Sequence, residues 1–364
     1  MLDQKTNLIL SLICFGLTVS AVAGPYTEVG VNGYIGSDWR HANPLIADPD
    51  TVINPIFMGW ATGVTAYEPA PGVWGMWANP ARALGPATGD KLDIVSLGDL
   101  NQNQIRQGTP PGSITLSFDE PNNIRNVKGY DFVIFENGFV SIADWGKGAI
   151  TGQMFAELGY VEVSSNGLDF ARFPSVSLTS GPVGMYGTIE ISNIYNLAGK
   201  HPNAAGVCTG TPFDLSEILD DPLVLSGDVN VNNINYVRIV DIPGSGDFDD
   251  SALEHIDPDT WPAWDYYMAD NPIYDAWVTF ESGGLDLEAI GVLNEQQFSA
   301  DINLDGIVDT FDLKLFCSAW LSHFGEENWI ARCDLAEPKD LVVNFLDFAV
   351  FAAEWQKTEQ WRSQ

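Results

Sequence analysis

Oxygen-bearing residues recur at fixed intervals over a stretch of twelve residues near the C-terminus. The stretch reads Asp301-Ile-Asn303-Leu-Asp305-Gly306-Ile307-Val-Asp309-Thr-Phe-Asp312. Positions 1, 3 and 5 offer side-chain oxygens, position 6 is a turn glycine, and position 7 offers its carbonyl. Position 9 acts through water, and position 12 closes the loop with a carboxylate. Because Ca²⁺ takes six or more hard oxygen ligands, this spacing predicts a calcium loop.

A second acidic stretch repeats this pattern with fourteen residues instead of twelve. It reads Asp334-Leu-Ala-Glu-Pro-Lys-Asp340-Leu341-Val-Val-Asn344-Phe-Leu-Asp347. Leu341 stands where the first stretch has its glycine, but both stretches end in the same polar-x-x-Asp pattern. We expect a second calcium loop of lower affinity, with ligands from Asp334, Asp340, Asn344 and Asp347.

The residues after each loop have helical periodicity and position the loops. We expect helices over Asp312–Phe324 and Asp347–Gln356. Aromatic residues lie four and eight positions after the last loop residue in both copies, namely Phe316 and Trp320, then Phe351 and Trp355. The C-terminal region, residues 296–364, is therefore predicted to be a small all-α module built from a duplicated loop–helix unit.

These motifs resemble a type I dockerin, most closely the divergent dockerin-like tails of exported proteins of Planctomycetes-type bacteria. The resemblance covers Ser299–Gln356. It implies a calcium-dependent module that docks onto a cohesin-like protein in an extracellular assembly. The second loop has fourteen residues, whereas twelve are usual in the family. This departure argues against a standard second calcium site and against symmetric, two-way docking.

Two cysteines fit the symmetry of the repeat. Cys317 follows the first loop by five residues, and Cys333 immediately precedes the second loop. If each helix packs against the start of the other loop, the two cysteines come close, and a disulfide between them would contribute about 3 kcal/mol. We expect this disulfide, which leaves Cys208 without an internal partner.

The N-terminus and the overall charge indicate export. Lys5 precedes an apolar run over Leu8–Val22 that is too short to span a bilayer and ends in Ala21-Val22-Ala23. We expect a signal peptide over residues 1–23 and a secreted or cell-surface product without a membrane span. Forty-nine acidic and sixteen basic residues give a net charge of −33, which disfavours nucleic acid and anionic lipid as partners.

Residues 24–295 are typical of a β-sandwich with long loops. Ser113–Phe118 and Tyr160–Ser164 alternate with period two, and Asn166-Gly167 after the second run favours a hairpin turn. Tyr130–Phe135 and Tyr236–Val240 are more continuously apolar, as the central strands of a sandwich are. Long amphipathic helices are not evident in this region.

The order of these strands resembles the galactose-binding-like, or discoidin-type, jelly roll. The hairpin Val161-Glu-Val-Ser-Ser-Asn-Gly-Leu-Asp-Phe170 and the strand Tyr236-Val-Arg-Ile-Val240 carry the resemblance. Asn79-Pro-Ala-Arg-Ala-Leu-Gly-Pro86 and Phe132-Val-Ile-Phe-Glu-Asn-Gly-Phe139 are similar to a group of bacterial cell-surface proteins over Gly59–Asn294. The expected fold is thus a mainly β jelly-roll sandwich followed by the dockerin-like module.

Catalytic motifs are sparse in the large region. Its histidines form no zinc-type cluster, and the region has neither a Gly-x-Ser-x-Gly elbow nor a phosphate-binding glycine loop. A pair of carboxylates, as in glycosidases, stays open, and Glu136 and Glu157 at strand ends are the candidates. The alternative for both is structural, because strand-end carboxylates commonly accept hydrogen bonds from loop amides.

Aromatic residues gather in one acidic segment of the large region, at Trp261, Trp264, Tyr266, Tyr267, Tyr274 and Trp277. Exposed aromatic rings stack against sugar faces, whereas packing of a long loop would bury them. We expect a non-catalytic, carbohydrate-binding protein that its calcium-dependent tail attaches to an extracellular assembly. A polysaccharide hydrolase and a structural surface-layer component stay open as alternatives.

Overall fold

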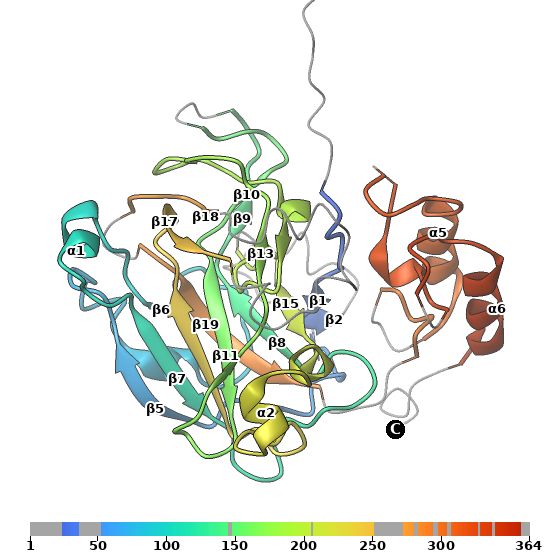
Figure 1. Ribbon diagram of the computed structural model, residues 1–364, viewed down its shortest axis with the longest axis horizontal. Helices are drawn as coiled ribbons and strands as arrows, with labels where there is room; N and C mark the ends of the chain where they lie inside the picture. Colours follow the sequence, from blue (N-terminus) through green and yellow to red (C-terminus); the bar gives the residue numbers. More distant parts are fainter. Residues whose placement is uncertain are drawn as a thin grey trace, which may run out of the picture.

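The structure is a computed structural model that describes residues 24–35, 52–144, 148–204, 207–250, 272–279, 283–293, 298–303, 307–326, 328–336 and 339–357. It is a mainly β structure with a small helical C-terminus, as predicted (Figure 1). The expected signal peptide over residues 1–23 lies outside the described residues, as do Asp305 and most of the aromatic segment.

Two antiparallel sheets form the large region. The first has the order β1 (Val31–Asn32), β15 (Thr209–Phe213), β8 (Phe132–Glu136), β19 (Asp286–Val292) and β4 (Gly59–Trp60), with β6 (Val95–Ser96) also paired to β19. The second has the order β12 (Ala171–Arg172), β11 (Gly159–Ser164), β16 (Tyr236–Asp241), β7 (Ser113–Ser117) and β5 (Gly63–Glu68). From β4 to β8 each successive strand lies in the other sheet, which is the alternation of a β-sandwich.

The central strands are those that the apolar runs predicted. β8 lies between β15 and β19, and β16 lies between β11 and β7. Every residue of β8 is buried, because Phe132 and Ile134 enter the core between the sheets while Val133 and Phe135 pack into a second apolar cluster on the other face. Burying a side chain of this size stabilises the fold by roughly 2–3 kcal/mol.

Short elements decorate the sandwich. They are the pairs β2 (Tyr34–Ile35) with β3 (Val52–Ile53), β9 (Phe139–Val140) with β10 (Met154–Phe155), β13 (Val176–Ser177) with β14 (Ile194–Tyr195) and β17 (Ser245–Asp249) with β18 (Pro272–Tyr274), and the helices α1 (Gln102–Arg106) and α2 (Pro222–Ser226). The expected hairpin joins β11 to β12, with Gly167 at φ 76°. The loop is longer than a two-residue turn, since β11 ends at Ser164 and β12 begins at Ala171. Asn166 Oδ1 stabilises it by accepting hydrogen bonds from the amides of Leu168 and Asp169.

The described part of the tail has two α-helices, α5 (Thr310–Ser318) and α6 (Phe345–Glu354). The first is shorter than predicted, whereas the second has the predicted length but begins and ends two residues earlier. Asp309 caps the first and Asn344 the second, each in a capping box with the aspartate three residues later. The prediction of a helix to Phe324 was wrong because Leu321 adopts a left-handed backbone, φ 61°, and its amide donates to Val343 O at 2.9 Å.

The tail has internal two-fold symmetry. Val308, at the end of the first loop, pairs through its backbone with Gln356 and Lys357 after α6. Val343, at the end of the second loop, pairs in the same way with Leu321 and Ser322 after α5. The rings of Phe316 and Phe351, one from each helix, lie 5.2 Å apart in the shared core. The structure therefore contains the predicted repeat as two interlocked units.

The tail contacts the sandwich beside the segment that leads into β1 (Figure 1). Thr27 Oγ1 donates to Trp329 O at 2.9 Å and accepts from the amide of Ala331 at 3.1 Å. The Arg332 guanidinium lies over the Tyr130 ring, 5.0 Å from its centroid. Among the described residues, no helix is long and apolar enough to cross a membrane.

Candidate functional site

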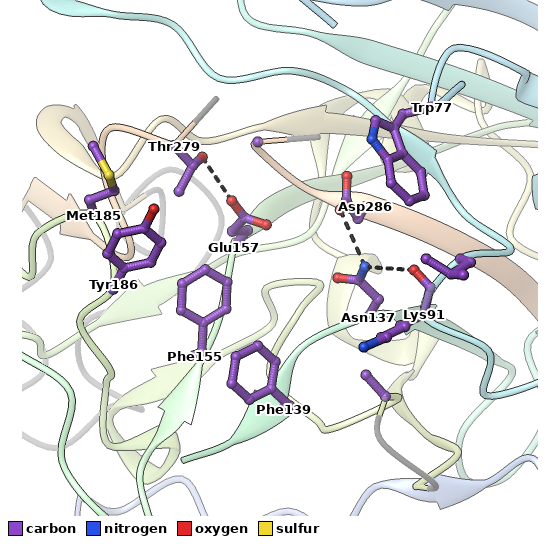
Figure 2. A pocket seen from close by; sticks show the side chains of 13 residues that line it. Trp77, Lys91, Asn137, Phe139, Phe155, Glu157, Met185, Tyr186, Thr279 and Asp286 are labelled. Carbon is purple, nitrogen blue, oxygen red and sulfur yellow. Dashed lines mark hydrogen bonds between the residues drawn. The ribbon is translucent and has the colours of Figure 1, made fainter. Parts of the chain in front are cut away.

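A cavity of about 570 Å³ opens at the end of the sandwich where β8 ends and β19 begins (Figure 2). Its walls come from segments far apart in the sequence. The lining residues are Trp77, Lys91, Leu92, Asn137, Phe139, Phe155, Glu157, Met185, Tyr186, Ala204, Thr279, Gly283 and Asp286. A volume of this size suits one or two sugar rings or a similar small ligand.

One wall of the cavity is aromatic. Phe139 in β9 and Phe155 in β10 stack with ring centroids 5.1 Å apart and an interplanar angle of 15°. β9 and β10 are paired, so the backbone ladder holds the two rings together. Phe139 is 41% exposed and Tyr186 is 47% exposed, which leaves ring faces open to a ligand. Figure 2 shows Trp77 on the opposite side.

The floor of the cavity is polar. Glu157 Oε1 accepts from the Thr279 hydroxyl at 2.8 Å and from the amide of Gly284 at 3.1 Å. Asn137 Nδ2 donates to Asp286 Oδ2 at 3.3 Å. Burial raises the pKa of Glu157 well above its usual range, and the neighbouring carboxyls of Asp286 and Glu136 raise it further. The floor thus offers carboxyl and amide groups that hydrogen-bond hydroxyls.

The two predicted carboxyl candidates have different places. Glu157 lines the cavity, whereas Glu136 is 1% exposed, accepts from the amide of Gly138 at 2.9 Å and does not line it. Burial raises the pKa of Glu136 as well, with Asp286 as the next cause. The second carboxyl of the cavity is Asp286, which the sequence reading missed. Its one signal was its position at the start of an apolar strand.

The predicted aromatic segment contributes little to this cavity. Of its six aromatic residues only Tyr274 and Trp277 are described, and neither lines the cavity. Trp277 Nε1 donates instead to Leu100 O at 2.9 Å. The aromatic residues of the cavity come from the loop before the 3₁₀ helix at Pro80–Ala83, from the β9–β10 pair and from the loop around Tyr186.

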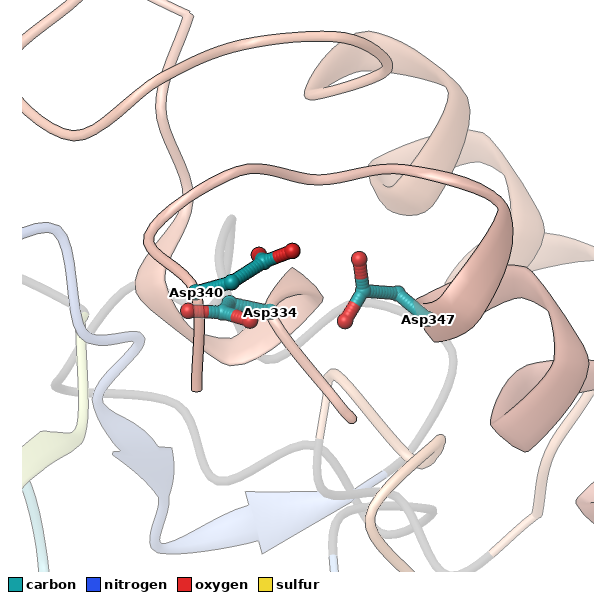
Figure 3. Close-up of side chains that lie close together, drawn as sticks. All are labelled: Asp334, Asp340 and Asp347. Atoms are coloured by element: carbon teal, nitrogen blue, oxygen red, sulfur yellow. The ribbon is translucent and has the colours of Figure 1, made fainter. Parts of the chain in front are cut away.

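The second predicted calcium loop brings three carboxylates together (Figure 3). Asp334, Asp340 and Asp347 each place a carboxylate oxygen within 4.8 Å of the others. Asp334 Oδ1 is buried and has no hydrogen-bond partner among the described residues. An all-oxygen set with an unpaired carboxylate oxygen fits Ca²⁺. These residues would hold the ion, whose two positive charges would offset most of the negative charge of the cluster.

Asn344, also predicted as a ligand, caps α6 and donates from Nδ2 to Asp340 Oδ2 at 2.9 Å. In the first loop, Asp301 and Asp312 are fully buried, and Asp309 caps α5. Asp305 lies outside the described residues, so the predicted ligand set of that loop, which also includes Asn303 and Ile307, is described in part.

The predicted disulfide is absent: Cys317 and Cys333 are free thiols. Cys317 is exposed on α5, whereas Cys333 is buried in the core of the tail, where burial raises its pKa to about 12. The pairing assumed that α5 presents Cys317 to the second loop. The core position on this helix belongs instead to the preceding residue, Phe316. Cys208 is a buried free thiol in the sandwich.

No protein-family model matches this chain, and no curated protein is similar to it in sequence. The chemistry of the cavity and of the acidic loops therefore carries the functional assignment.

Proposed function

We propose that this chain is an exported carbohydrate-binding protein, and that the cavity between the β9–β10 pair and the start of β19 is its glycan site. The observation that carries the proposal is the combination of an open aromatic wall with a polar floor. Sugar rings present apolar C–H faces and hydroxyl edges, so they need both kinds of surface at once.

The charges of the cavity favour an uncharged sugar. Glu157 and Asp286 on the floor can form hydrogen bonds with hydroxyls, and Lys91 is the one cationic residue among the described lining residues, so the cavity has no cluster of positive charge for an anionic ligand. The net charge of −33 acts in the same direction over a longer range. We therefore infer that the ligands are neutral hexose units of an extracellular polysaccharide.

The C-terminal module is proposed to be a calcium-binding, dockerin-like attachment device. The interlocked repeat and the carboxylates of Asp334, Asp340 and Asp347 support calcium binding. Phe345 and Leu346, on the first turn of α6, are 74% and 61% exposed, and Phe311 on α5 is 65% exposed. Large apolar residues on a surface suit a protein partner of the cohesin kind.

The test is a glycan array probed with the full chain in calcium-containing buffer. We expect retention on neutral hexose oligosaccharides and little on sulfated or uronic-acid glycans. Failure to retain any neutral glycan, with the protein shown to be folded by circular dichroism, would contradict the proposal. N-terminal sequencing of material recovered from the medium tests export, since the mature chain should begin near Gly24.

A second candidate is hydrolysis, because Glu157 and Asp286 are two carboxyls in one cavity and the pKa of Glu157 is raised, as in a general acid. Reducing-sugar release from a polysaccharide panel discriminates the two functions. Turnover that Glu157→Gln abolishes while binding persists would make the protein an enzyme. Binding without turnover supports the proposed function.

A further inference from the structure

Two buried carboxylate oxygens outside the cavity and outside the tail have no hydrogen-bond partner among the described residues. They are Asp99 Oδ1 and Asp241 Oδ2. Asp241 ends β16 and is 0% exposed, and Asp99 follows the turn after β6. No described lysine or arginine forms an ion pair with either residue. A buried anion without a counter-charge costs several kcal/mol, so these positions need a cation or a proton.

The protein holds one oxygen of each carboxylate and leaves the other free. Asp241 Oδ1 accepts from the amide of Leu285 at 2.8 Å. Asp99 Oδ2 accepts from the amide of Thr279 at 2.9 Å and lies 3.1 Å from its hydroxyl. These bonds fix the orientation of both carboxylates before any ligand arrives, which lowers the entropic cost of binding an ion.

A backbone carbonyl lies beside the Asp241 carboxylate. Gly284 has φ 76°, and a Cβ atom there would lie 2.6 Å from Gly98 O and 2.7 Å from Asp241 Oδ1, the oxygen that the Leu285 amide holds. The Gly98 carbonyl and the Asp241 carboxylate therefore both border Gly284, where a side chain would not fit. Asp99 is the next residue after Gly98, and after burial its charge is the largest cause that raises the pKa of Asp241.

Thr279 contacts only one oxygen of Asp99. Its hydroxyl lies 2.8 Å from Glu157 Oε1 and 3.1 Å from Asp99 Oδ2, and its amide also donates to Asp99 Oδ2. Asp99 Oδ1 therefore stays without a hydrogen-bond partner among the described residues.

We propose that Asp99, Asp241 and the carbonyl of Gly98 bind a calcium ion at the end of the second sheet. All three donors are hard oxygens, as Ca²⁺ prefers, and water completes a coordination shell of six to eight. Gly98 and Asp99 line a cavity of about 280 Å³, which offers room for water next to these two donors. The ion ties the turn after β6 to the end of β16 and to the segment before β19.

Equilibrium dialysis of the full chain with Ca²⁺, read by atomic absorption, tests this site. The background is Asp312→Ala/Asp347→Ala, which removes one carboxylate from each loop of the tail. This background should retain one bound ion, and adding Asp241→Asn should remove it together with the rise in melting temperature that Ca²⁺ causes. Asp99→Asn is the second variant, in case the first does not fold. Asp214→Asn is the control: it neutralises another aspartate of the sandwich whose pKa burial raises.

Tb³⁺ luminescence supplies an independent measurement, because the Trp277 indole is bonded to the carbonyl of Leu100, one residue from Asp99. In the same background, Trp277→Phe should reduce the sensitised emission and leave the Ca²⁺ stoichiometry unchanged. Unchanged stoichiometry in both Asp241→Asn and Asp99→Asn, with a higher melting temperature in chelator, would overturn the proposal. That result would mean that a proton, and not a cation, neutralises the pair.

Discussion

Asp312 and Asp347 make the same set of backbone hydrogen bonds in the two halves of the tail. Asp312 accepts from the amides of Ile302, Asn303 and Asp309 at 2.8–3.1 Å. Asp347 accepts from the amides of Leu335, Ala336 and Asn344 at 2.6–2.8 Å. The amides bonded at the start of the two loops are separated by 33 positions in the sequence, and those bonded at the end are separated by 35. The two-residue insertion is thus accommodated between them, and each aspartate closes its loop.

Asp347→Asn is expected to destabilise the tail even without calcium. The amide can keep one oxygen as an acceptor, but its NH₂ group faces a backbone donor, so at least one buried amide loses its partner at a cost of about 2 kcal/mol. Chemical denaturation in chelator measures the loss. Asp228→Asn, an exposed aspartate on the sandwich, is the matched control. Equal stability of the two variants would contradict this role.

Asp340→Asn is expected to separate metal binding from folding. Asp340 is exposed and belongs to the three-carboxylate cluster, so its neutralisation removes a calcium ligand and should change calcium-free stability by less than about 0.5 kcal/mol. The rise in melting temperature on adding Ca²⁺ should shrink. Asp220→Asn, exposed on the sandwich, should keep the full rise. A full rise in Asp340→Asn would show that the second loop binds no ion.

Phe139→Ala is expected to weaken binding of a neutral glycan by about tenfold or more, since it removes an exposed ring that can stack on a sugar face. Isothermal titration with an array-selected oligosaccharide measures the change. Trp74→Ala is the matched control, because Trp74 is 54% exposed but does not line the cavity. Equal affinity of Phe139→Ala and the wild type would show that the aromatic wall does not contribute to glycan binding.

Glu136→Gln is expected to change the pH dependence of stability. Burial raises the pKa of Glu136 above its usual 4.5, so the folded state keeps a proton that the unfolded state loses. The stabilisation is complete below about pH 4.5 and declines as pH rises, by up to about 1.4 kcal/mol per pH unit. Relative to wild type, the variant should therefore gain stability between pH 5 and pH 8 in urea denaturation. Parallel pH profiles would contradict this, and exposed Glu68→Gln is the control.

Sequence patterns predicted the parts of this protein that depend on neighbours along the chain. The apolar runs Tyr130–Phe135 and Tyr236–Val240 contain the central strands β8 and β16. Every residue of β8 is buried, whereas alternate residues of β16 are only partly buried. The 35-residue offset between Phe316 and Phe351 placed both rings in one core. The helix ends were harder to predict, because a long-range backbone bond to Val343 ends the first helical segment.

Other features depend on distances across the fold that no local pattern encodes. Asp286 and Glu157 share a cavity because β19 and β11 lie in different sheets whose ends meet there. Burial, which raises the pKa of Glu157, exists only in the folded chain.

Spacing alone predicted that the carboxylates of the second acidic loop meet, because a calcium loop of this type takes its ligands from one short segment. The tertiary structure decided which thiols are exposed and which carboxylates meet. Cys317 is an exposed free thiol and Cys333 a buried one, although the symmetry of the repeat predicted a disulfide between them. Asp99 and Asp241, 142 positions apart, affect each other's charge because the turn after β6 and the end of β16 both lie beside Gly284. Sheet order and side-chain packing set such distances, and both depend on the whole chain at once.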